Sequence, residues 1–250
     1  MTDGWTPVFI NCRDRVAHVQ QLVAWLEQAE GVGDIVLVDN ASTYQALLDW
    51  YASQSHRVVR LRDNVGPNGV WQSGILLAYN APQFIVTDDD VVPREDCPMD
   101  AVLRMRERLA AHPTWRGVGL AIEYEDLPAH YHVREAVIEH ESRFWRDRAE
   151  PGLWKAAIDS ANMPMYRKGR DWMCTFDQVP YLPLLPGVQE LLFDSVGGET
   201  RRFDRPYVVR HLPWYLDWAA LPDDERYYLR HMKPGCGACW SENHRGPAVL

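Results

Sequence analysis

Up to Pro93, the chain alternates short apolar segments with segments of helical periodicity, and this alternation constrains the fold more than any other feature. The apolar segments predict four strands: Pro7 to Asn11, Asp34 to Asp39, Arg57 to Leu61 and Phe84 to Thr87. They are nearly all apolar, which is typical of parallel strands buried on both faces. Strands that alternate with helices predict an α/β fold with a mostly parallel central sheet and right-handed crossovers.

Apolar residues at helical spacing predict the helices between these strands. We expect a first helix over residues 15–29, and a second that Ser42 or Thr43 caps and that continues through Tyr51. A third should follow the turn at Pro67-Asn68-Gly69. The looser second half predicts a helix over residues 99–111, a strand from Gly117 to Ile122, loop and helix from Glu123 to Arg148, a loop from Pro180 to Pro186 and a polar tail from Pro222.

Length and composition favour one globular unit. The 250 residues are 46% hydrophobic and 24% charged, without a repeat or a break in composition that would mark a linker. We therefore expect a single domain over 1–250, with one half at 1–95 and a second half with the C-terminal tail at 96–250. A formal net charge of −9 gives no basic surface for a phosphate backbone, so nucleic acid is not expected as a partner.

Location and cysteine chemistry follow from what the sequence lacks. We find no run of about 20 apolar residues for a membrane span and no secretory signal after Met1, so we expect a cytoplasmic protein, with peripheral membrane contact still allowed. Five cysteines without an export signal favour reduced thiols. Cys236 and Cys239 form a CxxC pair whose role the sequence leaves open; incidental or structural cysteines are favoured over a zinc site or a redox pair.

Polar residues follow each of the predicted strands of the first half. Ligands of open α/β sheets bind at the carboxyl ends of the strands, so these segments predict the position of a site. They are Asn11-Cys12-Arg13-Asp14, Asp39-Asn40, Arg62-Asp63-Asn64 and Asp88-Asp89-Asp90.

The acidic triplet Asp88-Asp89-Asp90 carries the strongest chemical signal. Three adjacent carboxylates repel one another unless something neutralises them. In an extended segment Asp88 and Asp90 point to the same side, where their oxygens would suit Mg²⁺ or Mn²⁺ shared with a diphosphate. The alternative is a solvated acidic turn, but the place of the triplet after the fourth strand favours a metal site.

Asp39 ends the second predicted strand, in Val38-Asp39-Asn40-Ala41-Ser42. An acidic residue there can accept hydrogen bonds from a base or a ribose. It can equally belong to a helix-capping turn, because Asp, Asn and Ser are all good caps. A dinucleotide cofactor is disfavoured, since NCRDR follows the first strand in place of a Gly-rich phosphate loop.

The ordered series PVFINCRDR, IVLVDNAS, RDNVGPNG and FIVTDDDVVP resembles the donor half of GT-A glycosyltransferases of the broad family 2 group. That resemblance covers about the first 95 residues and rests on the order of the motifs, including an Asn-x-Gly turn at Asn64 and a DxD motif at Asp88 to Asp90. It implies a GT-A fold, with nucleotide-sugar binding in residues 1–95 and acceptor binding in 96–250. It also implies a nucleotide-diphosphate sugar donor, most often a UDP-sugar, a carbohydrate or glycoconjugate acceptor, and Mn²⁺ or Mg²⁺.

The resemblance also assigns roles to residues. Asp39 would contact the base, Asp88 would lie near the ribose or the metal, and Asp90 would bind the metal. The remaining nucleotide-pocket candidates are Asn11, Arg13, Asn40, Asn64 and Asp89. Many such enzymes complete the metal site with a later His, for which we select His211; the alternative is a His simply hydrogen-bonded near the surface.

An inverting enzyme needs a carboxylate that takes the proton of the acceptor. Asp159, a lone acid after an apolar stretch, is the first candidate for base or acceptor anchor, followed by Glu123 and Asp126. Each of these could instead be a helix cap or a surface charge. Stereochemistry, donor sugar, acceptor and oligomeric state are left open.

Two other functions compete with the glycosyltransferase. A nucleotidyltransferase also uses paired carboxylates on an α/β sheet, but normally has a Gly-rich loop after its first strand. A catalytically inactive GT-A-like protein would bind a nucleotide-sugar or glycan without turnover, and the intact acidic triplet argues against it.

Overall fold

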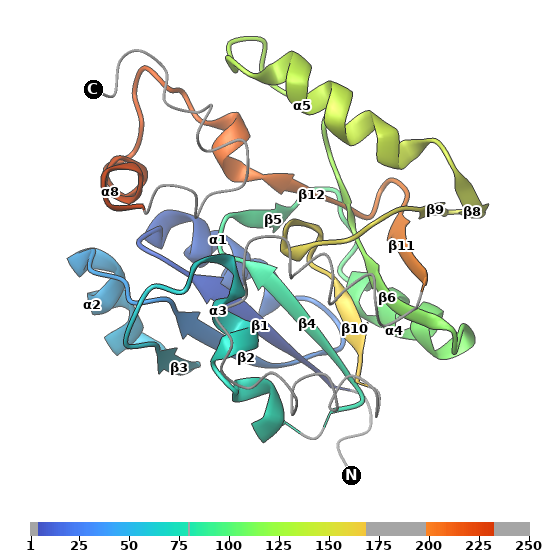
Figure 1. Ribbon diagram of the computed structural model, residues 1–250, viewed down its shortest axis with the longest axis horizontal. Coiled ribbons are helices and arrows are strands. Elements are labelled where there is room, and N and C mark those ends of the chain that lie inside the picture. The colour runs from blue at the N-terminus through green and yellow to red at the C-terminus, as the bar shows by residue number, and fades with distance from the viewer. Residues whose placement is uncertain (1–4, 80, 169–198, 233–250) are drawn as a thin grey trace.

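The computed structural model describes residues 5–79, 81–168 and 199–232 (Figure 1). They build a nine-stranded sheet in the order β3-β2-β1-β4-β10-β6-β11-β9-β8 and a three-stranded sheet in the order β5-β12-β7. The strands are β1 (Thr6–Cys12), β2 (Val32–Asp39), β3 (Arg57–Arg60), β4 (Gln83–Asp88), β5 (Val91–Pro93), β6 (Trp115–Gly119), β7 (Ala121–Ile122), β8 (Arg148–Glu150), β9 (Leu153–Lys155), β10 (Met165–Arg167), β11 (Glu199–Phe203) and β12 (Val208–His211).

The helices are α1 (Val16–Leu26), α2 (Gln45–Ser53), α3 (Gly69–Gln72), α4 (Ala101–Ala111), α5 (Arg134–Glu141) and α8 (Asp223–His231). Short 3₁₀ turns are η1 (Gly66–Asn68), η2 (Ile75–Ala78), η3 (Ser142–Trp145), η4 (Ser160–Asn162) and η5 (Leu212–Tyr215). The strands and the first two helices expected up to Pro93 are therefore present, with ends shifted by a few residues.

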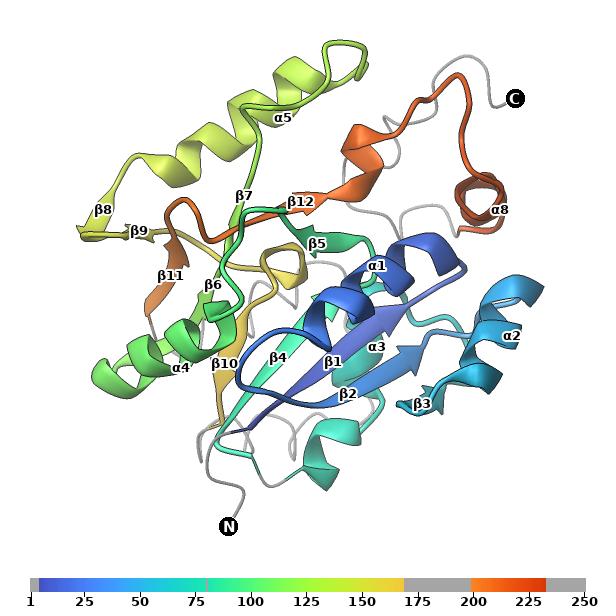
Figure 2. The same cartoon turned by 180° about the vertical axis from the view of Figure 1, so that it is seen from behind.

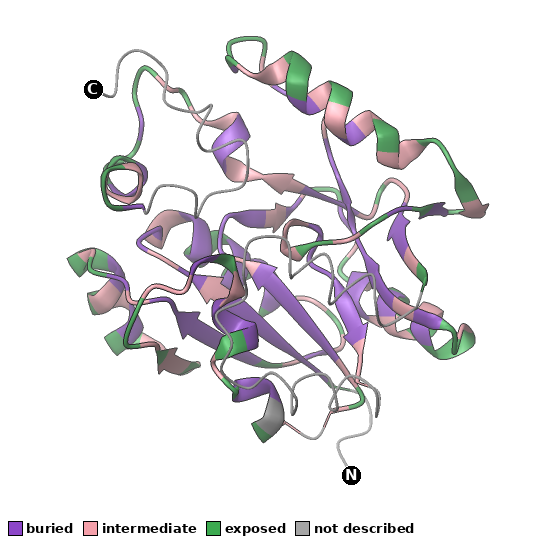
Figure 3. Cartoon of the chain, in the orientation of Figure 1, coloured by how far each residue is buried: buried purple, intermediate pink, exposed green. Residues whose placement is uncertain are grey.

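The strands β3, β2, β1 and β4 are parallel to one another. β2, β1 and β4 form the buried centre of the first half, and β3 is its partly exposed edge strand. Their side chains alternate between two cores, as the pleat requires. Val8 and Ile10 of β1 join the core beneath α1, α2 and α4, whereas Phe9 faces a second core that contains Val70 and Trp71 of α3. Figures 1 and 2 show α1 and α3 on opposite faces of the sheet, and Figure 3 shows that β1, β2 and β4 are mostly buried.

The order of the strands reverses between β1 and β4. From β1 the chain adds β2 and then β3 on one side, and β4 pairs with the other side of β1. Loops at the carboxyl ends of β1 and β4 diverge at such a point and leave room for a ligand. The acidic triplet follows β4 directly, so it lies at this position.

The second half departs from a parallel sheet. β10 is antiparallel to both β4 and β6, and β9 is antiparallel to β11 and β8, so the nine-stranded sheet as a whole is mixed. Of the β11 pairings, the one with β6 is parallel.

The single strand expected from Gly117 to Ile122 is wrong, because the chain changes sheets there. β6 belongs to the large sheet and β7 to the small one. Between them Leu120 donates its N–H to the carbonyl of Asn162, and the Asn162 side chain donates to the carbonyl of Leu120. Both segments are equally buried and apolar, so periodicity could not separate them.

Two details of the predicted helices are also corrected. Neither Ser42 nor Thr43 caps α2; the buried Asp14 side chain accepts hydrogen bonds from the N–H groups of Thr43 and Tyr44 instead. The helix expected after the Pro67-Asn68-Gly69 turn is broken into α3 and η2 at Gly74, which has a φ of 72°.

The tail expected to be merely polar from Pro222 contains α8. Three acidic residues in its first turn and two basic ones in its last turn are the sequence signal that was available, since both complement the helix dipole. The loop expected from Pro180 to Pro186 and the pair Cys236 and Cys239 lie outside the described residues. Within those residues no helix is long and apolar enough to cross a membrane.

Candidate functional site

The acidic triplet lies where β4 ends and β5 begins, and each carboxylate has a different environment. Asp89 turns inward and accepts a 2.7 Å hydrogen bond from the backbone N–H of Arg13. Asp88 is half-buried and accepts a 2.5 Å bond from the hydroxyl of Ser160 in η4. Asp90 is 6% exposed and contacts Arg15 and His211.

Asp90 is held through one of its two carboxylate oxygens. Its Oδ2 lies 2.6 Å from Nη1 of Arg15 and 3.4 Å from Nε2 of His211. Its Oδ1 is buried and has no hydrogen-bond partner among the described residues, and Nδ1 of His211 is in the same condition. A buried carboxylate oxygen without a donor is costly, so Oδ1 marks a place where a ligand is missing.

The backbone keeps His211 beside Asp90. β12 pairs with β5 so that His211 is opposite Val91, and Leu212 donates its N–H to the backbone carbonyl of Asp90. The His211 ring also packs against Trp214, with 4.7 Å between ring centroids. The structure thus brings His211 to Asp90, two residues that lie 121 positions apart in the sequence (211 minus 90).

The pKa values of the triplet are pulled apart. Burial and then the neighbouring Asp90 charge raise the pKa of Asp88 to about 7. Burial and Asp90 also raise the pKa of Asp89. Burial acts in the same direction on Asp90, but His211 and Arg15 outweigh it and lower the pKa of that carboxyl. Adjacent acids with opposed pKa shifts are typical of functional sites.

Arg15 and α8 form a part of this site that the sequence analysis missed. Glu225 of α8 accepts from Nε and Nη2 of Arg15 at 2.8 and 2.9 Å, and the guanidinium carbon lies 3.6 Å from the ring centroid of Tyr228. Asp224 of α8 accepts a hydrogen bond from the N–H of Ala17 in the first turn of α1. The contacts join residues up to 210 positions apart, so no local motif could reveal them.

Three of the predicted nucleotide-binding residues hold the loops of the site together. Arg13 donates through Nη1 to the carbonyls of Asn40 and Ala41. The buried Asn40 side chain donates to the Gly66 carbonyl and accepts from the N–H of Val65. Asn64 accepts from the N–H of Gly66, whose φ of 75° needs a glycine. These hydrogen bonds are all with backbone groups of the chain itself.

Asp39 is fully buried at the end of β2. It accepts hydrogen bonds from the N–H of Ser42 and from Nε of Arg60, at 3.1 and 2.9 Å. The turn and the ion pair occupy both oxygens, but Asp39 does not cap α2, whose N-cap is Tyr44. Its contact with a base stays a prediction.

Asn11 ends β1 beside the triplet, and its side chain forms a hydrogen bond that lowers the pKa of Asp88. Its Oδ1 is buried without a partner among the described residues. A Cβ added to Gly69 would lie 2.3 Å from that oxygen, so the start of α3 approaches Asn11 as closely as only glycine allows. Asn11 thus faces the same region as Asp88 and Asp90.

Asp159 is exposed and is the N-cap of η4, which is far from the triplet in the sequence but contacts it through Ser160. The Asp159 side chain accepts a hydrogen bond from the N–H of Ala161. The side-chain oxygen of Asn162 accepts one from the backbone N–H of Asp159, which completes a capping box. The following residue, Ser160, binds Asp88. Asp159 is therefore both a cap and a carboxylate close enough to raise the pKa of Asp88 by its charge.

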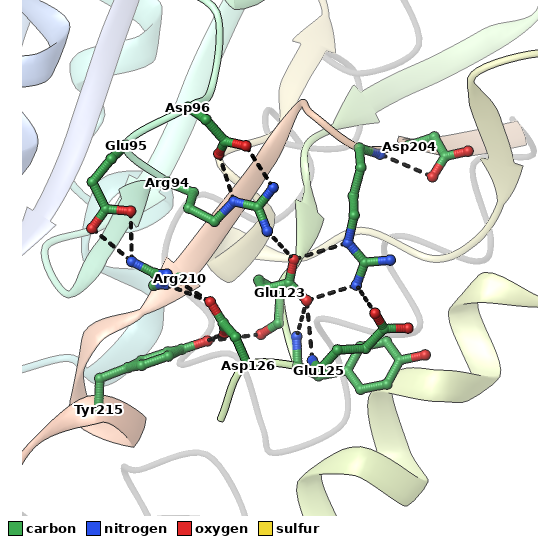
Figure 4. Close-up of polar contacts among 11 residues, drawn as sticks. Arg94, Glu95, Asp96, Glu123, Glu125, Asp126, Asp204, Arg210 and Tyr215 are labelled. Carbon is green, nitrogen blue, oxygen red and sulfur yellow. Dashed lines mark hydrogen bonds and ion pairs between the residues drawn. The ribbon is translucent and has the colours of Figure 1, made fainter. Parts of the chain in front are cut away.

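Glu123 and Asp126 lie in a separate ion-pair network, which we call the Glu123 cluster (Figure 4). Glu123 is 1% exposed and accepts five hydrogen bonds, from the side chains of Arg94 and Arg205 and from the N–H groups of Tyr124 and Glu125. These donors outweigh the effect of burial and lower the pKa of Glu123. A carboxylate bound in this way is poorly suited to accept a proton.

Asp126 sits at the exposed rim of the same cluster. It accepts from Nη2 of Arg210 and from the hydroxyl of Tyr215, both at 2.6 Å. Arg210 also binds Glu95, which ties β12 to the loop after β5. The contacts of Asp126 are thus with the elements that frame the small sheet.

The triplet fits a divalent cation. No three His, Cys, Asp or Glu side chains of the described residues already converge as a complete cage. The open Oδ1 of Asp90 and the adjacent Asp88 instead offer a few hard oxygen ligands. Mg²⁺ and Mn²⁺ are commonly bound by one or two carboxylates and take their other ligands from phosphates and water.

The fold is similar to that of known glycosyltransferases. The mannosyltransferase PcManGT from Pyrobaculum calidifontis, in complex with GDP-Man and Mn²⁺, matches with a TM-score of 0.51 at 12% identity, over 90% of this chain and 60% of that chain. S. aureus TarS matches with a TM-score of 0.53 at 11% identity, over 90% of this chain and 38% of that chain. TarS 1–349 in complex with UDP gives 0.52 at 13% identity, over 90% and 63%.

These likenesses show the GT-A fold. The chain spans less than two thirds of the length of each of these structures, at 60%, 38% and 63%. No family model matches the sequence, and no curated protein matches it.

Proposed function

We propose that this chain is a metal-dependent glycosyltransferase that moves a sugar from a nucleotide-diphosphate sugar to a carbohydrate or glycoconjugate acceptor in the cytoplasm. The observation that carries the proposal is the Oδ1 of Asp90, a buried carboxylate oxygen without a donor among the described residues, in an acidic triplet at the point where the strand order reverses. A cation shared with a diphosphate would satisfy this oxygen and relieve the repulsion among the three acids.

Asp90 and Asp88 are the residues we propose to hold Mn²⁺ or Mg²⁺ together with the phosphates of the donor. His211, whose Nε2 lies 3.4 Å from Oδ2 of Asp90, would join them after a rotation of its ring. The ion would supply positive charge at the diphosphate, which offsets the negative charge that develops on the leaving nucleotide. Ser160 orients Asp88 by its 2.5 Å bond, and the pairing of β12 with β5 keeps His211 beside Asp90.

We propose that the nucleotide lies over the carboxyl ends of β1, β2 and β4. Asn11 lies beside this region through its hydrogen bond to Asp88, whereas Arg13, Asn40, Asn64 and Asp89 shape the loops that surround it. Asp39 would either support the base indirectly, by holding the turn at Ser42, or contact the edge of the base itself. UDP is the favoured nucleotide, and the complex of TarS with UDP supports that choice, while the GDP-Man complex of PcManGT keeps GDP as the alternative.

Asp159 is the carboxylate we propose to accept the proton of the acceptor hydroxyl. It is exposed, it lies beside the triplet through Ser160, and its side chain accepts a hydrogen bond from the N–H of Ala161. Glu123 is a weaker candidate, because its five donors stabilise the ionised form.

Thermal unfolding tests the proposal directly. Melting temperatures are measured with UDP, GDP and ATP, each with and without Mn²⁺. We expect a nucleoside diphosphate to raise the melting temperature only when Mn²⁺ is present; a ligand at 100 times its Kd adds about 2.7 kcal/mol to the free energy of unfolding. Stabilisation by ATP alone would indicate a nucleotidyltransferase instead.

Release of nucleotide separates an enzyme from a binding protein. Each candidate UDP-sugar and GDP-sugar is incubated with the chain and Mn²⁺, and free UDP or GDP is measured over time. Slow release into water, accelerated by an acceptor, is the expected result. Binding without any release across the donors would leave a GT-A-like binding protein as the better description.

A further inference from the structure

Arg15 connects α8 to Asp90 through a buried ion cluster, which stability alone does not explain. Arg15, Asp90 and Glu225 are all less than one-tenth exposed, and one guanidinium binds both carboxylates. Buried ion clusters of this kind often add nothing to stability compared with apolar residues of similar size. The cluster also touches Asp90, whose Oδ1 is buried and has no hydrogen-bond partner among the described residues.

The geometry fixes the rotation of the Asp90 carboxylate. Nη1 of Arg15 and Nε2 of His211 both contact Oδ2, at 2.6 and 3.4 Å, so Oδ1 is left on the side away from them. Arg15 itself is fixed by the two parallel bonds from Glu225 and by the ring of Tyr228. A bidentate pair of this kind sets direction as well as energy.

The charges explain why a second carboxylate is present. Arg15 alone beside Asp90 would cancel its charge and weaken its attraction for a cation. With Glu225 included, two negative groups share one positive group, so the cluster keeps one net negative charge. Glu225 therefore allows Arg15 to orient Asp90 without neutralising it.

We propose that Arg15, held by Glu225 of α8, is a positioning residue that turns Oδ1 of Asp90 toward the divalent cation. The inference rests on the proposed metal role of Asp90. It assigns α8, which follows the rest of the described chain, a part in assembling a site at the end of β4. Groups that orient a metal ligand typically change metal affinity by about 10–100-fold when they are removed.

Mn²⁺ affinity of the full chain without nucleotide tests the inference, measured by calorimetry and by the loss of the free Mn²⁺ signal in electron paramagnetic resonance. The double variant Arg15→Met/Glu225→Met removes one positive and one negative charge, so the net charge is unchanged. We expect Mn²⁺ to bind about 10-fold more weakly or worse. Unchanged or tighter binding would overturn the inference, since Arg15 would then merely compete with the cation.

Arg15→Lys provides a second variant that keeps the charge. Lysine cannot bind Glu225 through two parallel bonds and reach Asp90 at the same time, so Mn²⁺ affinity should again fall by about 10-fold. If Arg15→Lys folds and binds Mn²⁺ as the wild-type chain does, the positioning role is wrong even where the double variant does not fold.

The chain offers a matched control in the buried pair Glu141 and Arg202, with 2.9 Å between Oε2 and Nη1. Glu141→Met/Arg202→Met is also charge-neutral and should leave Mn²⁺ affinity unchanged. An equal loss of Mn²⁺ affinity in this variant would mean that any buried ion pair matters, and would overturn the inference.

Asp224→Asn weakens the contact of α8 with α1 without touching Arg15, and should change Mn²⁺ affinity less than Arg15→Lys does. A wild-type chain that binds Mn²⁺ neither alone nor with saturating UDP or GDP would instead overturn the proposed function.

Discussion

The acidic triplet and the Glu123 cluster are both built from carboxylates at strand ends, but they differ in how the charge is neutralised. Glu123 has two arginines and two backbone N–H groups on its two oxygens. Asp90 has a donor on Oδ2 and none on Oδ1 among the described residues, and the neighbouring Asp88 and Asp89 have raised pKa values.

This difference distinguishes an ion-pair network that supports the fold from a site that binds a ligand. The Glu123 cluster joins β5, β7 and β12 and is complete without any ligand (Figure 4). The triplet is incomplete, because Oδ1 of Asp90 has no donor among the described residues. The other contacts of the three acids are with Arg15, His211, Ser160, Asn11 and one backbone N–H. Burial and charge alone would have ranked both as functional, and only the count of donors on each oxygen distinguishes them.

The largest effect we expect is the complete loss of Mn²⁺-dependent nucleotide binding in Asp90→Ala. The substitution removes the open oxygen and the carboxylate that it belongs to, so added Mn²⁺ should no longer increase affinity for a nucleoside diphosphate. Calorimetric titration with and without Mn²⁺ measures this. Asp96→Ala, which removes an exposed partner of Arg94, is the matched control and should bind as the wild type. Retained Mn²⁺ dependence in Asp90→Ala would place the metal elsewhere.

Glu123→Ala should show the opposite pattern. It leaves Arg94 and Arg205 facing a cavity without their shared carboxylate, which we expect to cost about 3 kcal/mol of unfolding free energy, the lower end for a broken buried pair because the arginines are partly exposed. Chemical denaturation gives that free energy, and nucleotide titration at low temperature should show unchanged Kd in the folded fraction. A large rise in Kd with normal stability would make Glu123 part of the site.

Asp159→Asn tests the carboxylate that borders the triplet but lies outside it. Because asparagine is also a good helix cap, η4 should keep its capping turn, and stability should change little. Loss of a general base lowers turnover by about 100-fold or more, so nucleotide transfer to an acceptor should fall that far while Kd for the diphosphate is unchanged. Turnover within twofold of the wild type would leave Asp159 as a cap only.

The comparison also shows which parts of the site the sequence could predict. The strands up to β4 and the triplet were found because each signal is local: apolar residues in a run, then three acids. The pairing of Arg15 with Glu225 was missed because its partners are 210 positions apart. The roles of Asp39 and Asn40 stayed open for a related reason, since a cap and a ligand contact use the same residue types.

The second half was harder to predict because its strands are short and mixed in direction. β8, β9 and β10 have three residues each, too few for a periodic pattern to emerge. His211 was found by its neighbours in sequence, an apolar run and a turn, yet its contact with Asp90 depends on the pairing of β12 with β5. That pairing is a long-range choice that no window of sequence contains.

The smallest effect is expected at Asp126, the exposed member of the Glu123 cluster. Asp126→Asn keeps an acceptor for the hydroxyl of Tyr215 but removes the charge opposite Arg210, which retains Glu95. An ion pair at such a rim contributes about 0–1 kcal/mol, so the unfolding free energy should fall by less than about 1 kcal/mol, with nucleotide affinity and turnover unchanged. A drop of turnover by tenfold or more with that small loss of stability would mean that the acceptor reaches this rim. Glu123 would then still belong to a structural ion-pair network, whereas Asp126 would belong to a binding site.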